Sequence, residues 1–382
     1  MLMPDSAANH PVVSVIVPAR NEEASLGNCL QSLVAQEGLS FEIIVVDDGS
    51  TDRTLEIAQS FAGVRVIDAG ALPPGWTGKN NAVWSGSKQA RGQWLLFTDA
   101  DTVHAPGSLA RSIAEAQQHH VTWLSYSPEQ EVHGLWEKAV MPVIFAELAA
   151  TYRPSQVSDL AFPAAAANGQ YLLVSREAYD AVGGHAAIAT SLLEDVALAR
   201  AVKASGRRIL FRYGRDRVSA RMYRSFAQLQ EGWTKNLALL FTSPFRLAVL
   251  RLMEFVLIVS GATVAAVDAS LGHPRTAIVA GGVTVVLAAF FLKRIRRAHF
   301  SWDADILSLI GLPLFSYLLL RSRLFYKRGN VTWKGRSYAA GTTREHPVGT
   351  REGHGFRGCV ETEDRPRAVE RPARISRKAA SE

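Results

Sequence analysis

Short apolar runs alternate with segments of helical spacing through residues 12–213. The runs over residues 12–17, 42–46 and 93–98 have the length of buried strands, and the last two end at acidic residues. Strands that alternate with helices form βαβ units and a mostly parallel sheet. In such sheets ligands bind beyond the carboxyl ends of the strands. The chain is therefore predicted to have an α/β fold, with functional residues at one edge of the sheet.

The remaining elements follow from the same patterns. Pro18 is expected to end the first strand, because proline cannot donate a hydrogen bond to a sheet. Ser50 or Thr51 suits the cap of a helix, and Pro106 suits the first turn of another. Further strands are predicted over residues 64–67, 121–125 and 208–213, and helices over residues 21–33, 51–62, 80–90, 194–205 and 225–240.

Two acidic clusters follow predicted strands. Asp99 and Asp101 come directly after one strand, and two carboxylates on a turn can face one Mg²⁺ or Mn²⁺ ion. A diphosphate leaving group needs such a cation, because negative charge builds up on it as its bond breaks. An Asp-x-Asp sequence in a loop is usually solvated or capping, so its place after an apolar strand is what favours a metal site. Asp47 and Asp48 end another strand, where a carboxylate can accept from a uracil N–H or a ribose hydroxyl, or cap the next helix.

Further charged residues open predicted helices. Glu194 and Asp195 suit a helix N-terminus electrostatically, and either could be a general base that removes a proton from an acceptor hydroxyl. Lys79 lies in a glycine-containing loop before a helix, where a lysine can reach phosphates, although the spacing is not that of an NTPase loop. Among the histidines, His104, His119 and His120 are expected at the surface, and His185 is expected at a turn, where it could also line a pocket.

The last third of the chain carries three apolar segments, over residues 247–267, 277–292 and 306–320. Each is near or slightly below the ~20 residues that a helix needs to cross a bilayer. Buried core helices are the alternative, but three such segments in succession with basic flanks favour a membrane region. Basic flanks indicate the cytoplasmic side and anionic lipid head groups. They are Arg246, Arg251, Lys293, Arg294, Arg296, Arg297, Arg321, Arg323, Lys327 and Arg328.

Many of the basic residues that give the chain its positive charge flank these apolar segments. The net charge is +7, which could indicate nucleic-acid binding. The basic residues flank apolar segments instead and form no patch with interleaved aromatic residues, so no nucleic acid partner is expected. Cys29 and Cys359 lie far apart and in no motif, which excludes a disulfide framework.

Four motifs occur in a fixed order: Val-Pro-Ala-Arg-Asn-Glu-Glu (17–23), Val-Val-Asp-Asp-Gly-Ser-Thr-Asp (45–52), Asp-Ala-Asp (99–101) and Glu-Asp (194–195). This set resembles the family 2 inverting glycosyltransferases with the GT-A fold, over residues 12–240. The resemblance implies a nucleotide-sugar donor, usually a UDP-sugar, and a catalytic base at Asp195 beside Glu194. It also implies Mg²⁺ or Mn²⁺ at Asp99 and Asp101. The implied donor-binding residues are Pro18, Arg20, Glu22, Asp48, Lys79 and Asp99.

Finer motifs resemble a subgroup of that family. Residues 72–80, 231–236 and 331–336 are similar to membrane glycosyltransferases of the hopanoid-associated and carotenoid-glycosylating type. The subgroup implies a lipid acceptor of polyisoprenoid, hopanoid or carotenoid type. Residues 230–236 depart from the Gln-x-x-Arg-Trp signature of processive members, which favours a single transfer. Residues implied on the acceptor or product side are Trp233, Lys235, Trp333 and Lys334.

The sequence therefore predicts a membrane-bound hexosyltransferase, multi-pass in a bacterial-type inner membrane, with its catalytic domain in the cytoplasm. The expected parts are an N-terminal tail (1–11), a GT-A domain (12–243), a membrane region (244–328), a return segment with Trp-Lys-Gly-Arg (329–341) and a disordered tail (342–382). Because the third apolar segment is short and contains Pro313, we expect it to be re-entrant or interfacial. A polyprenyl-phosphate glycosyltransferase is the alternative enzyme. A nucleotide-sugar sensor or membrane scaffold is the non-enzymatic alternative.

Overall fold

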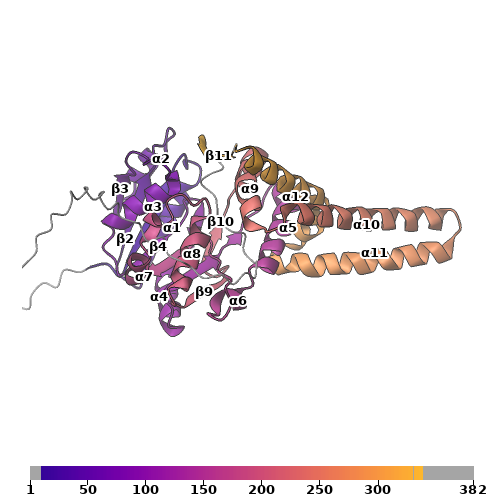
Figure 1. The fold of residues 1–382 in the computed structure, drawn as a ribbon, viewed down its shortest axis with the longest axis horizontal. Helices are drawn as coiled ribbons and strands as arrows, with labels where there is room; N and C mark the ends of the chain where they lie inside the picture. The colour runs from indigo at the N-terminus through magenta and orange to yellow at the C-terminus, as the bar shows by residue number, and fades with distance from the viewer. Residues whose placement is uncertain (1–9, 330, 339–382) are drawn as a thin grey trace, which may run out of the picture. The chain divides into compact units, whose positions relative to one another are not determined.

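A seven-stranded sheet forms the centre of the first two thirds of the chain (Figure 1). The computed structural model describes residues 10–329 and 331–338. The strands are β1 (Val13–Ala19), β2 (Phe41–Asp47), β3 (Val64–Asp68), β4 (Trp94–Phe97), β6 (Trp123–Ser127), β8 (Leu172–Ser175) and β9 (Ile209–Tyr213). Their order is β3-β2-β1-β4-β8-β6-β9, and neighbours run parallel except at β8, which is antiparallel to β4 and β6. The prediction of an α/β fold with a mostly parallel sheet is confirmed.

Helices cover both faces of this sheet. They are α1 (Leu26–Val34), α2 (Thr54–Gln59), α3 (Gly78–Gln89), α4 (Ser108–Gln118), α6 (Pro154–Ser158), α7 (Arg176–Ala181), the 3₁₀ turn η1 (Gly184–Ala186) and α8 (Glu194–Ala204). Helices α5 (Leu135–Thr151) and α9 (Phe226–Leu240) pack against the long helix α12 (Trp302–Arg328) instead. Alternate residues of β1 point to opposite faces, so Val15 packs in the layer with α1 and Ile16 in the layer with α3. A Cβ at Gly86 of α3 would lie 2.6 Å from Cγ2 of Ile16, so glycine permits this close approach.

Strand β1 continues through Pro18, so the predicted end of this strand is wrong. The carbonyl oxygens of Val12 and Ile16 accept from the N–H groups of Trp94 and Thr98, so even-numbered residues of β1 face β4. The ladder with β4 ends at Ile16. Pro18 therefore faces a side where the ladder has ended, and its missing N–H removes no bond there.

Two helices begin later than predicted, and helices α5, α6 and α7 were not predicted. Asn21 has a left-handed backbone (φ 52°), and a turn precedes α1. The Asp52 carboxylate accepts from the N–H and the hydroxyl of Thr54, at 3.0 and 2.5 Å, so α2 begins at Thr54. Helix α5 was missed because its 17 residues are apolar around most of their circumference and contain Pro142. Such a segment has no one-sided period to detect.

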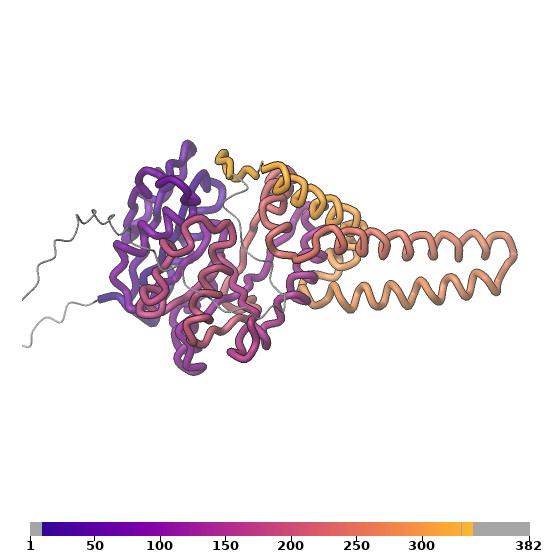
Figure 2. The backbone as a smooth tube through the Cα atoms, viewed as in Figure 1, coloured from indigo at the N-terminus to yellow at the C-terminus, as the bar shows by residue number. Residues whose placement is uncertain are grey.

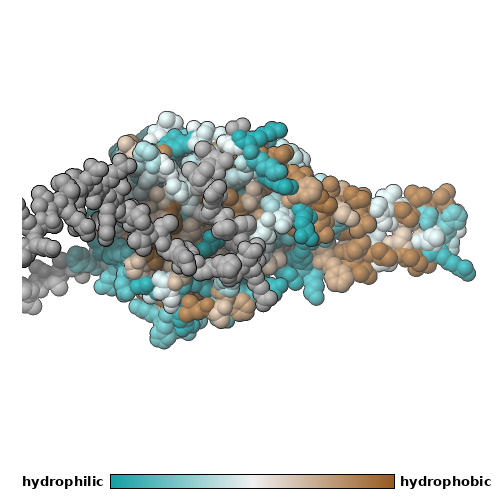
Figure 3. All heavy atoms as spheres, in the orientation of Figure 1, coloured by the Kyte–Doolittle hydropathy of each residue, from teal (hydrophilic) through white to brown (hydrophobic). Residues whose placement is uncertain are grey.

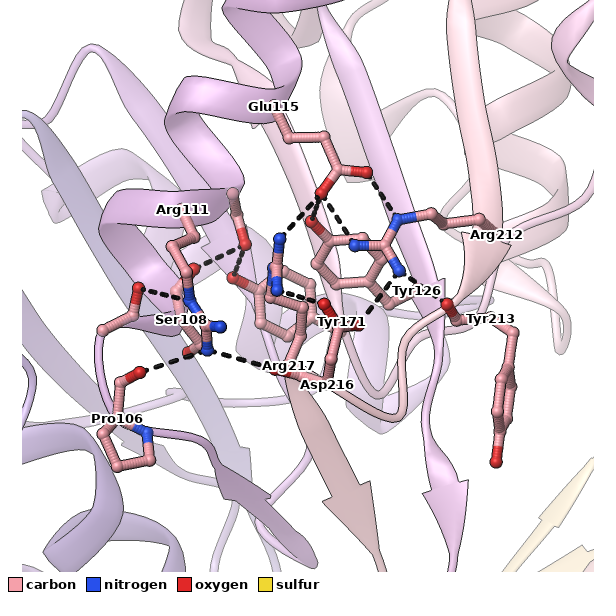
Figure 4. A network of polar contacts seen from close by, with 12 residues as sticks. Pro106, Ser108, Arg111, Glu115, Tyr126, Tyr171, Arg212, Tyr213, Asp216 and Arg217 are labelled. Atoms are coloured by element: carbon pink, nitrogen blue, oxygen red, sulfur yellow. Dashed lines mark hydrogen bonds and ion pairs between the residues drawn. The ribbon is translucent and has the colours of Figure 1, made fainter. Parts of the chain in front are cut away.

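A polar network joins the edge of the sheet to α4 (Figure 4). Glu115 lies 2.5 Å from Arg212 of β9 and 3.3 Å from Arg217, and it accepts a hydrogen bond from the Tyr126 hydroxyl at 2.7 Å. Burial alone would raise the pKa of Glu115, but Arg212 and Tyr126 outweigh it and lower that pKa. A small second sheet lies beside this network, in the order β5 (Thr102–His104), β10 (Val218–Ala220) and β7 (Glu129–Gln130). The network fixes β9 and the start of β10.

Three long helices follow: α10 (Pro244–Ser270), α11 (Pro274–Ile295) and α12 (Trp302–Arg328), with the 3₁₀ turn η2 (Arg296–Ala298) before α12. Each of the three is long and apolar enough to cross a membrane. All extend beyond the predicted segments, and α12 continues through Pro313 as one helix. Helices α10 and α11 form a hairpin that projects away from the sheet (Figure 1), and apolar side chains gather over α10–α12 (Figure 3). Helix α12 packs against α5, α9 and α10 instead.

An ion-pair cluster joins the α10–α11 hairpin to the sheet domain. Glu147 of α5 lies 2.9 Å from Arg251 of α10 and 3.3 Å from Arg294 of α11. Glu254 of α10 lies 3.0 and 2.8 Å from the same two arginines. All four side chains are largely buried. The two positive and two negative charges balance, so removing one would leave a buried charge without compensation.

The described chain ends by returning to its N-terminal third (Figure 2). Strands β11 (Val331–Trp333) and β12 (Arg336–Tyr338) form a short antiparallel hairpin. Its turn residues Lys334 and Gly335 both have left-handed backbones, with φ of 46° and 76°, as a two-residue type I′ turn requires.

Candidate active site

One cavity of about 690 Å³ lies at the carboxyl ends of β1, β2 and β4. Every residue that the sequence predicted for the donor, the metal, the base and the acceptor side lines it. These residues are Pro18, Arg20, Glu22, Asp48, Lys79, Asp99, Asp101, Glu194, Asp195, Trp233, Lys235, Trp333 and Lys334. The structure therefore brings the predicted residues together, and their individual roles stay predictions.

Asp99 and Asp101 lie on the turn between β4 and β5. The Thr102 hydroxyl donates to the carbonyl oxygen of Asp99 at 2.8 Å and tightens this turn. The amide nitrogen of Gln170 approaches both carboxylate oxygens of Asp101 at 3.4 Å. Burial, with the charges of Asp99 and Glu22, raises the pKa of Asp101 to about 7. The turn thus presents two carboxylates whose negative charge favours a cation.

Lys79 bridges this acidic turn and the start of α8. Its ammonium group lies 2.7 Å from Asp99 Oδ1 and 2.7 Å from Glu194 Oε1. Burial alone would lower the pKa of Lys79, but the two carboxylates raise it well above its ordinary value. A permanent positive charge therefore stands in the first turn of α3, where the helix N-terminus also favours anions.

Asp195 is held by two backbone groups. Its Oδ2 accepts from the N–H of Gly169 at 2.9 Å, and its Oδ1 accepts from the N–H of Val196 at 2.8 Å. Burial and the neighbouring Glu194 raise the pKa of Asp195 to about 7. Burial alone would also raise the pKa of Glu194, but Lys79 outweighs it and lowers that pKa. Two adjacent carboxylates thus differ: Glu194 stays ionised, and Asp195 can gain and lose a proton near neutral pH.

Asn80 holds the loop in front of α8, and sequence analysis missed it. Its Nδ2 lies 2.9 Å from the carbonyl oxygen of Ile188 and 3.0 Å from those of Ala189 and Ser191. The Asn80 side chain is fully buried. Its two N–H groups are thus shared among three carbonyl oxygens, which fixes the segment that leads into the Glu194–Asp195 pair. The only sequence signal was a polar residue in the first turn of a helix, next to Lys79.

The β11–β12 hairpin contacts the donor end of the cavity. The Arg336 guanidinium contacts both carboxylate oxygens of Asp48, one of them at 3.0 Å. The Lys334 ammonium contacts the Glu22 carboxylate and lies 2.9 Å from the carbonyl oxygen of Arg20. Lys334 was predicted on the acceptor side, yet its partners are residues predicted for the donor. Arg336 was not predicted as a site residue, although its motif was noted.

The remaining acceptor-side residues differ in exposure. Trp233 is 2% exposed, and its ring packs against Tyr223 while its N–H donates to the sulfur of Met141 at 3.4 Å. Trp233 is therefore mainly a core residue at the cavity wall. Lys235 lies with its ammonium group 4.9 Å from the ring centroid of Trp333, and burial lowers its pKa.

The opposite end of the cavity is apolar and reaches the base of the long helices. Phe145, Leu148 and Tyr152 of α5, Leu240 of α9 and Ala298 of η2 line this end. Since η2 directly follows α11, the cavity extends from Asp195 to the point where the α10–α11 hairpin joins the domain. An apolar stretch of cavity wall is suited to an apolar part of a ligand.

One histidine prediction is wrong. His104 is 3% exposed, and its Nε2 lies 3.2 and 3.3 Å from the hydroxyls of Thr98 and Thr102. It is buried because β5 pairs with β10, which covers it. Burial lowers the pKa of His104 to about 3. His185 is also buried, with Nδ1 2.8 Å from the Tyr179 hydroxyl.

Comparison with known proteins assigns the domain. Residues 14–183 match the family described as Glycosyl transferase family 2. The matched range contains Asp48, Lys79 and Asp99, and it ends before Asp195. Over these residues the chain therefore matches this family, and its mixed sheet is that of a GT-A fold. The family predicted from the ordered motifs is confirmed.

Individual relatives and similar structures share less than a third of their residues with this chain. The chain is 28% identical to the 4,4'-diaponeurosporenoate glycosyltransferase of Staphylococcus aureus over 351 residues, which cover 87% of this chain and 89% of that protein. A mannosyltransferase of Pyrobaculum calidifontis in complex with GDP-Man and Mn²⁺ is 16% identical, with a TM-score of 0.47 over 83% of this chain and 87% of its own. TarS 1–349 of S. aureus in complex with UDP-GlcNAc is 18% identical, with a TM-score of 0.40 over 86% and 98%.

Proposed function

We propose that this enzyme transfers a hexose from a nucleoside diphosphate sugar, UDP-hexose in the leading form, to a lipid acceptor at the membrane surface, with inversion at the anomeric carbon. The observation that carries the proposal is the single cavity. The charged residues predicted for the donor, Asp195, and apolar residues of α5, α9 and η2 at the base of the long helices all line it. The name of the staphylococcal relative supports an acceptor of carotenoid type.

The donor end suits a nucleoside diphosphate. Asp48 and Glu22 present carboxylates that can accept hydrogen bonds from a base N–H or from ribose hydroxyls. Lys79 adds a positive charge at the N-terminus of α3, where free N–H groups and the helix dipole favour phosphate. Base, ribose and phosphates would then lie between the ends of β1, β2 and β4.

Asp99 and Asp101 would hold a divalent cation. Two carboxylate oxygens suit Mg²⁺ or Mn²⁺, and the raised pKa of Asp101, caused by burial and its acidic neighbours, marks a place where a cation is favoured. In the described ranges, no three or more His, Cys, Asp or Glu side chains are grouped to hold a metal ion. Donor phosphates and water would complete the ligand set. When bound, the ion would supply positive charge to the leaving diphosphate.

The transfer step uses the groups around Asp195. The acceptor hydroxyl oxygen attacks the anomeric carbon from the face opposite the diphosphate. The bond between that carbon and the phosphate oxygen breaks, the nucleoside diphosphate leaves with the electron pair, and the hydroxyl proton passes to Asp195. The N–H groups of Gly169 and Val196 hold the Asp195 carboxylate in position. A positioned base of this kind accelerates a reaction about 10²–10⁴-fold.

Contacts at both ends of α12 support a topology with two membrane crossings. Near its start, Asp303 pairs with Lys138 of α5 at 2.6 Å. Near its end, the Tyr326 hydroxyl donates to the carbonyl oxygen of Lys235 in α9 at 2.7 Å. Because α5 and α9 line the same cavity as the ends of β1, β2 and β4, both ends of α12 lie on the side of the catalytic site. We therefore propose that α10 and α11 cross the inner membrane and that α12 is interfacial on the cytoplasmic side. The argument from shortness is wrong, since α12 has 27 residues.

An anionic acceptor is the second candidate. The staphylococcal relative is named for diaponeurosporenoate, a carboxylate, and the cavity lining also includes the basic side chains Lys235 and Arg297. A carboxylate or a polyprenyl phosphate would arrive without the proton that a hydroxyl must lose. Transfer to such an acceptor would not need Asp195 as a base.

The test is the Asp195→Asn variant, assayed with UDP-hexose and lipid acceptors bearing a hydroxyl, a carboxylate or a phosphate. We expect transfer to a hydroxyl to fall about 10²–10⁴-fold, with donor binding retained. Asp180→Asn, an exposed carboxylate on α7, is the matched control. Near-normal transfer to the hydroxyl acceptor in Asp195→Asn would contradict the base assignment. Retained transfer to an anionic acceptor alone would favour the second candidate.

The same assay has a pH signature. A base must be deprotonated, and burial together with Glu194 raises the pKa of Asp195 to about 7. Activity with a hydroxyl acceptor should therefore fall as the pH drops through about 7. A rate that stays constant from pH 8 to pH 5 would contradict proton transfer to Asp195.

A further inference from the structure

The β11–β12 hairpin, residues 331–338, is fixed to the donor end at three points. Arg336 makes a two-point contact with Asp48, which is 7% exposed. Lys334 contacts Glu22 and the carbonyl oxygen of Arg20, and its own carbonyl oxygen accepts from the Arg20 guanidinium at 3.3 Å. In Figure 2 the yellow end of the described chain lies beside its indigo N-terminal third. The hairpin is therefore part of the wall of the donor site.

A glycine in α3 makes room for Arg336. A Cβ added to Gly78 would lie 1.6 Å from a guanidinium nitrogen of Arg336 and 2.6 Å from Asp48 Oδ2. Gly78 is the first residue of α3 and precedes Lys79. The Arg336 guanidinium, the Asp48 carboxylate and the helix N-terminus thus meet at one point, within reach of a ligand that spans base and phosphates.

The charges at the donor end are paired with one another. Arg336 neutralises Asp48, and Lys334 neutralises Glu22. A nucleoside at Asp48 and Glu22 needs the carboxylate oxygens that these cations now contact. A diphosphate brings negative charge, which the same two cations can bind. A bound donor would therefore compete with Glu22 and Asp48 for Lys334 and Arg336.

We propose that Lys334 and Arg336 are donor-binding residues, and that the β11–β12 hairpin is a clasp which exchanges its contacts with Glu22 and Asp48 for the phosphates and nucleoside of the donor. The inference rests on the proposed function, because it takes Glu22 and Asp48 as the donor end. It moves Lys334 from the acceptor side to the donor side and adds Arg336 to the site. Helix α12 delivers the clasp, so its packing on the sheet domain also positions the donor site.

The experiment titrates UDP and GDP, side by side, into the full-length chain in lipid nanodiscs with Mg²⁺, by calorimetry. Lys334→Ala and Arg336→Ala should each weaken binding of the preferred nucleotide about 10- to 100-fold, the range for a lost charge-assisted hydrogen bond. Gly78→Ala should weaken it in the same direction, although it removes no charge. Lys327→Ala, an exposed lysine in the last turn of α12, should bind as the wild type does.

The variants and the wild type together distinguish a wrong assignment of the clasp from a wrong proposed function. Wild-type affinity or tighter binding in Arg336→Ala and Lys334→Ala, with nucleotide bound normally by the wild type, would overturn the clasp alone. No binding of either nucleotide by the wild type would overturn the proposed function and the clasp together. Uridine is the further probe: Lys334→Ala should bind uridine normally and UDP poorly, and equal losses would overturn the phosphate contact. Thermal unfolding without nucleotide identifies variants that have lost the fold, and Arg336→Lys then replaces Arg336→Ala as the test.

Discussion

Helices α10 and α12 have the same length, 27 residues, and similar mean hydropathy in their most apolar stretch, 1.9 and 1.6. Their surroundings differ. In that stretch 11% of the residues of α10 are buried, against 50% in α12. Composition alone assigns both helices to the membrane, whereas packing separates a projecting hairpin from a helix that lies on the catalytic domain. Hydropathy shows that a helix can bury apolar surface, but only its packing shows whether that surface is buried against protein or left free to face lipid.

Small and polar residues explain why α12 packs so closely. The Ser316 hydroxyl donates to the carbonyl oxygen of Ala248 in α10 at 2.9 Å, and Ser322 donates to that of Thr234 in α9 at 2.6 Å. Gly311 lets the backbone of α12 approach Ala139 of α5. The α10–α11 hairpin presents Val, Leu and Phe side chains to its surroundings instead.

The largest effect on stability is expected at the ion-pair cluster between α5 and the α10–α11 hairpin. Within the described ranges, Glu147→Gln leaves Arg251 and Arg294 with one carboxylate partner, Glu254, so the cluster keeps an uncompensated buried charge. We expect a loss of about 3–5 kcal/mol in the free energy of unfolding, measured in detergent micelles. Glu177→Gln, which removes an exposed pair with Arg207, is the matched control. Equal stability of the two variants would show that the joint is not a structural contact.

Lysine substitution separates a helix that crosses the bilayer from one at its surface. Val285 lies near the middle of α11 and is 68% exposed, and Ile310 of α12 is 51% exposed. Val285→Lys should cost about 2.5–3.5 kcal/mol in membrane insertion. Ile310→Lys should cost less, because its ammonium group can reach the head groups. Membrane-insertion assays measure the free-energy cost of each substitution. Equal costs would contradict the proposal that α11 crosses the bilayer while α12 lies at its surface.

The smallest effect tests the packing of α12. A Cβ at Gly311 would lie 1.8 Å from the carbonyl oxygen of Ala139, whereas one at Gly282 of α11 meets nothing within 4 Å. Gly311→Ala should therefore destabilise the chain by about 1–3 kcal/mol. Gly282→Ala should be neutral or slightly stabilising, since alanine favours a helix. Thermal unfolding of the two variants compares them, and a neutral Gly311→Ala would mean that α12 is not held against α5.

Much of the candidate site was predictable because strand ends and sequence motifs coincide. Asp48 and Asp99 follow buried strands, and parallel strands bring their carboxyl ends to one edge. Arg336 and Asn80 were not predicted, because their importance comes from contacts with Asp48 and with the loop before α8. Those contacts join residues 288 and 108 positions apart, and no local pattern records them.

Among the helices, α5 and α12 were the least predictable. Helix α5 has no one-sided apolar pattern, and α12 contains Pro313, which reads as a break. Contacts with α5, α9 and α10 hold α12 as one helix across that proline. The helix–strand alternation before residue 126 was predictable because each element carries its own periodicity.

Sided cysteine labelling tests the central claim, that α10 and α11 cross the membrane while α12 keeps the clasp on the catalytic side. Cys359 is first changed to Ser, and buried Cys29 is left in place. Single cysteines then replace Leu271 between α10 and α11, Lys327 at the end of α12, and Asp180 on the catalytic domain. We expect a membrane-impermeant maleimide to label Leu271→Cys in intact cells, and Lys327→Cys and Asp180→Cys only after permeabilisation. Labelling of Lys327→Cys from outside intact cells would contradict the account.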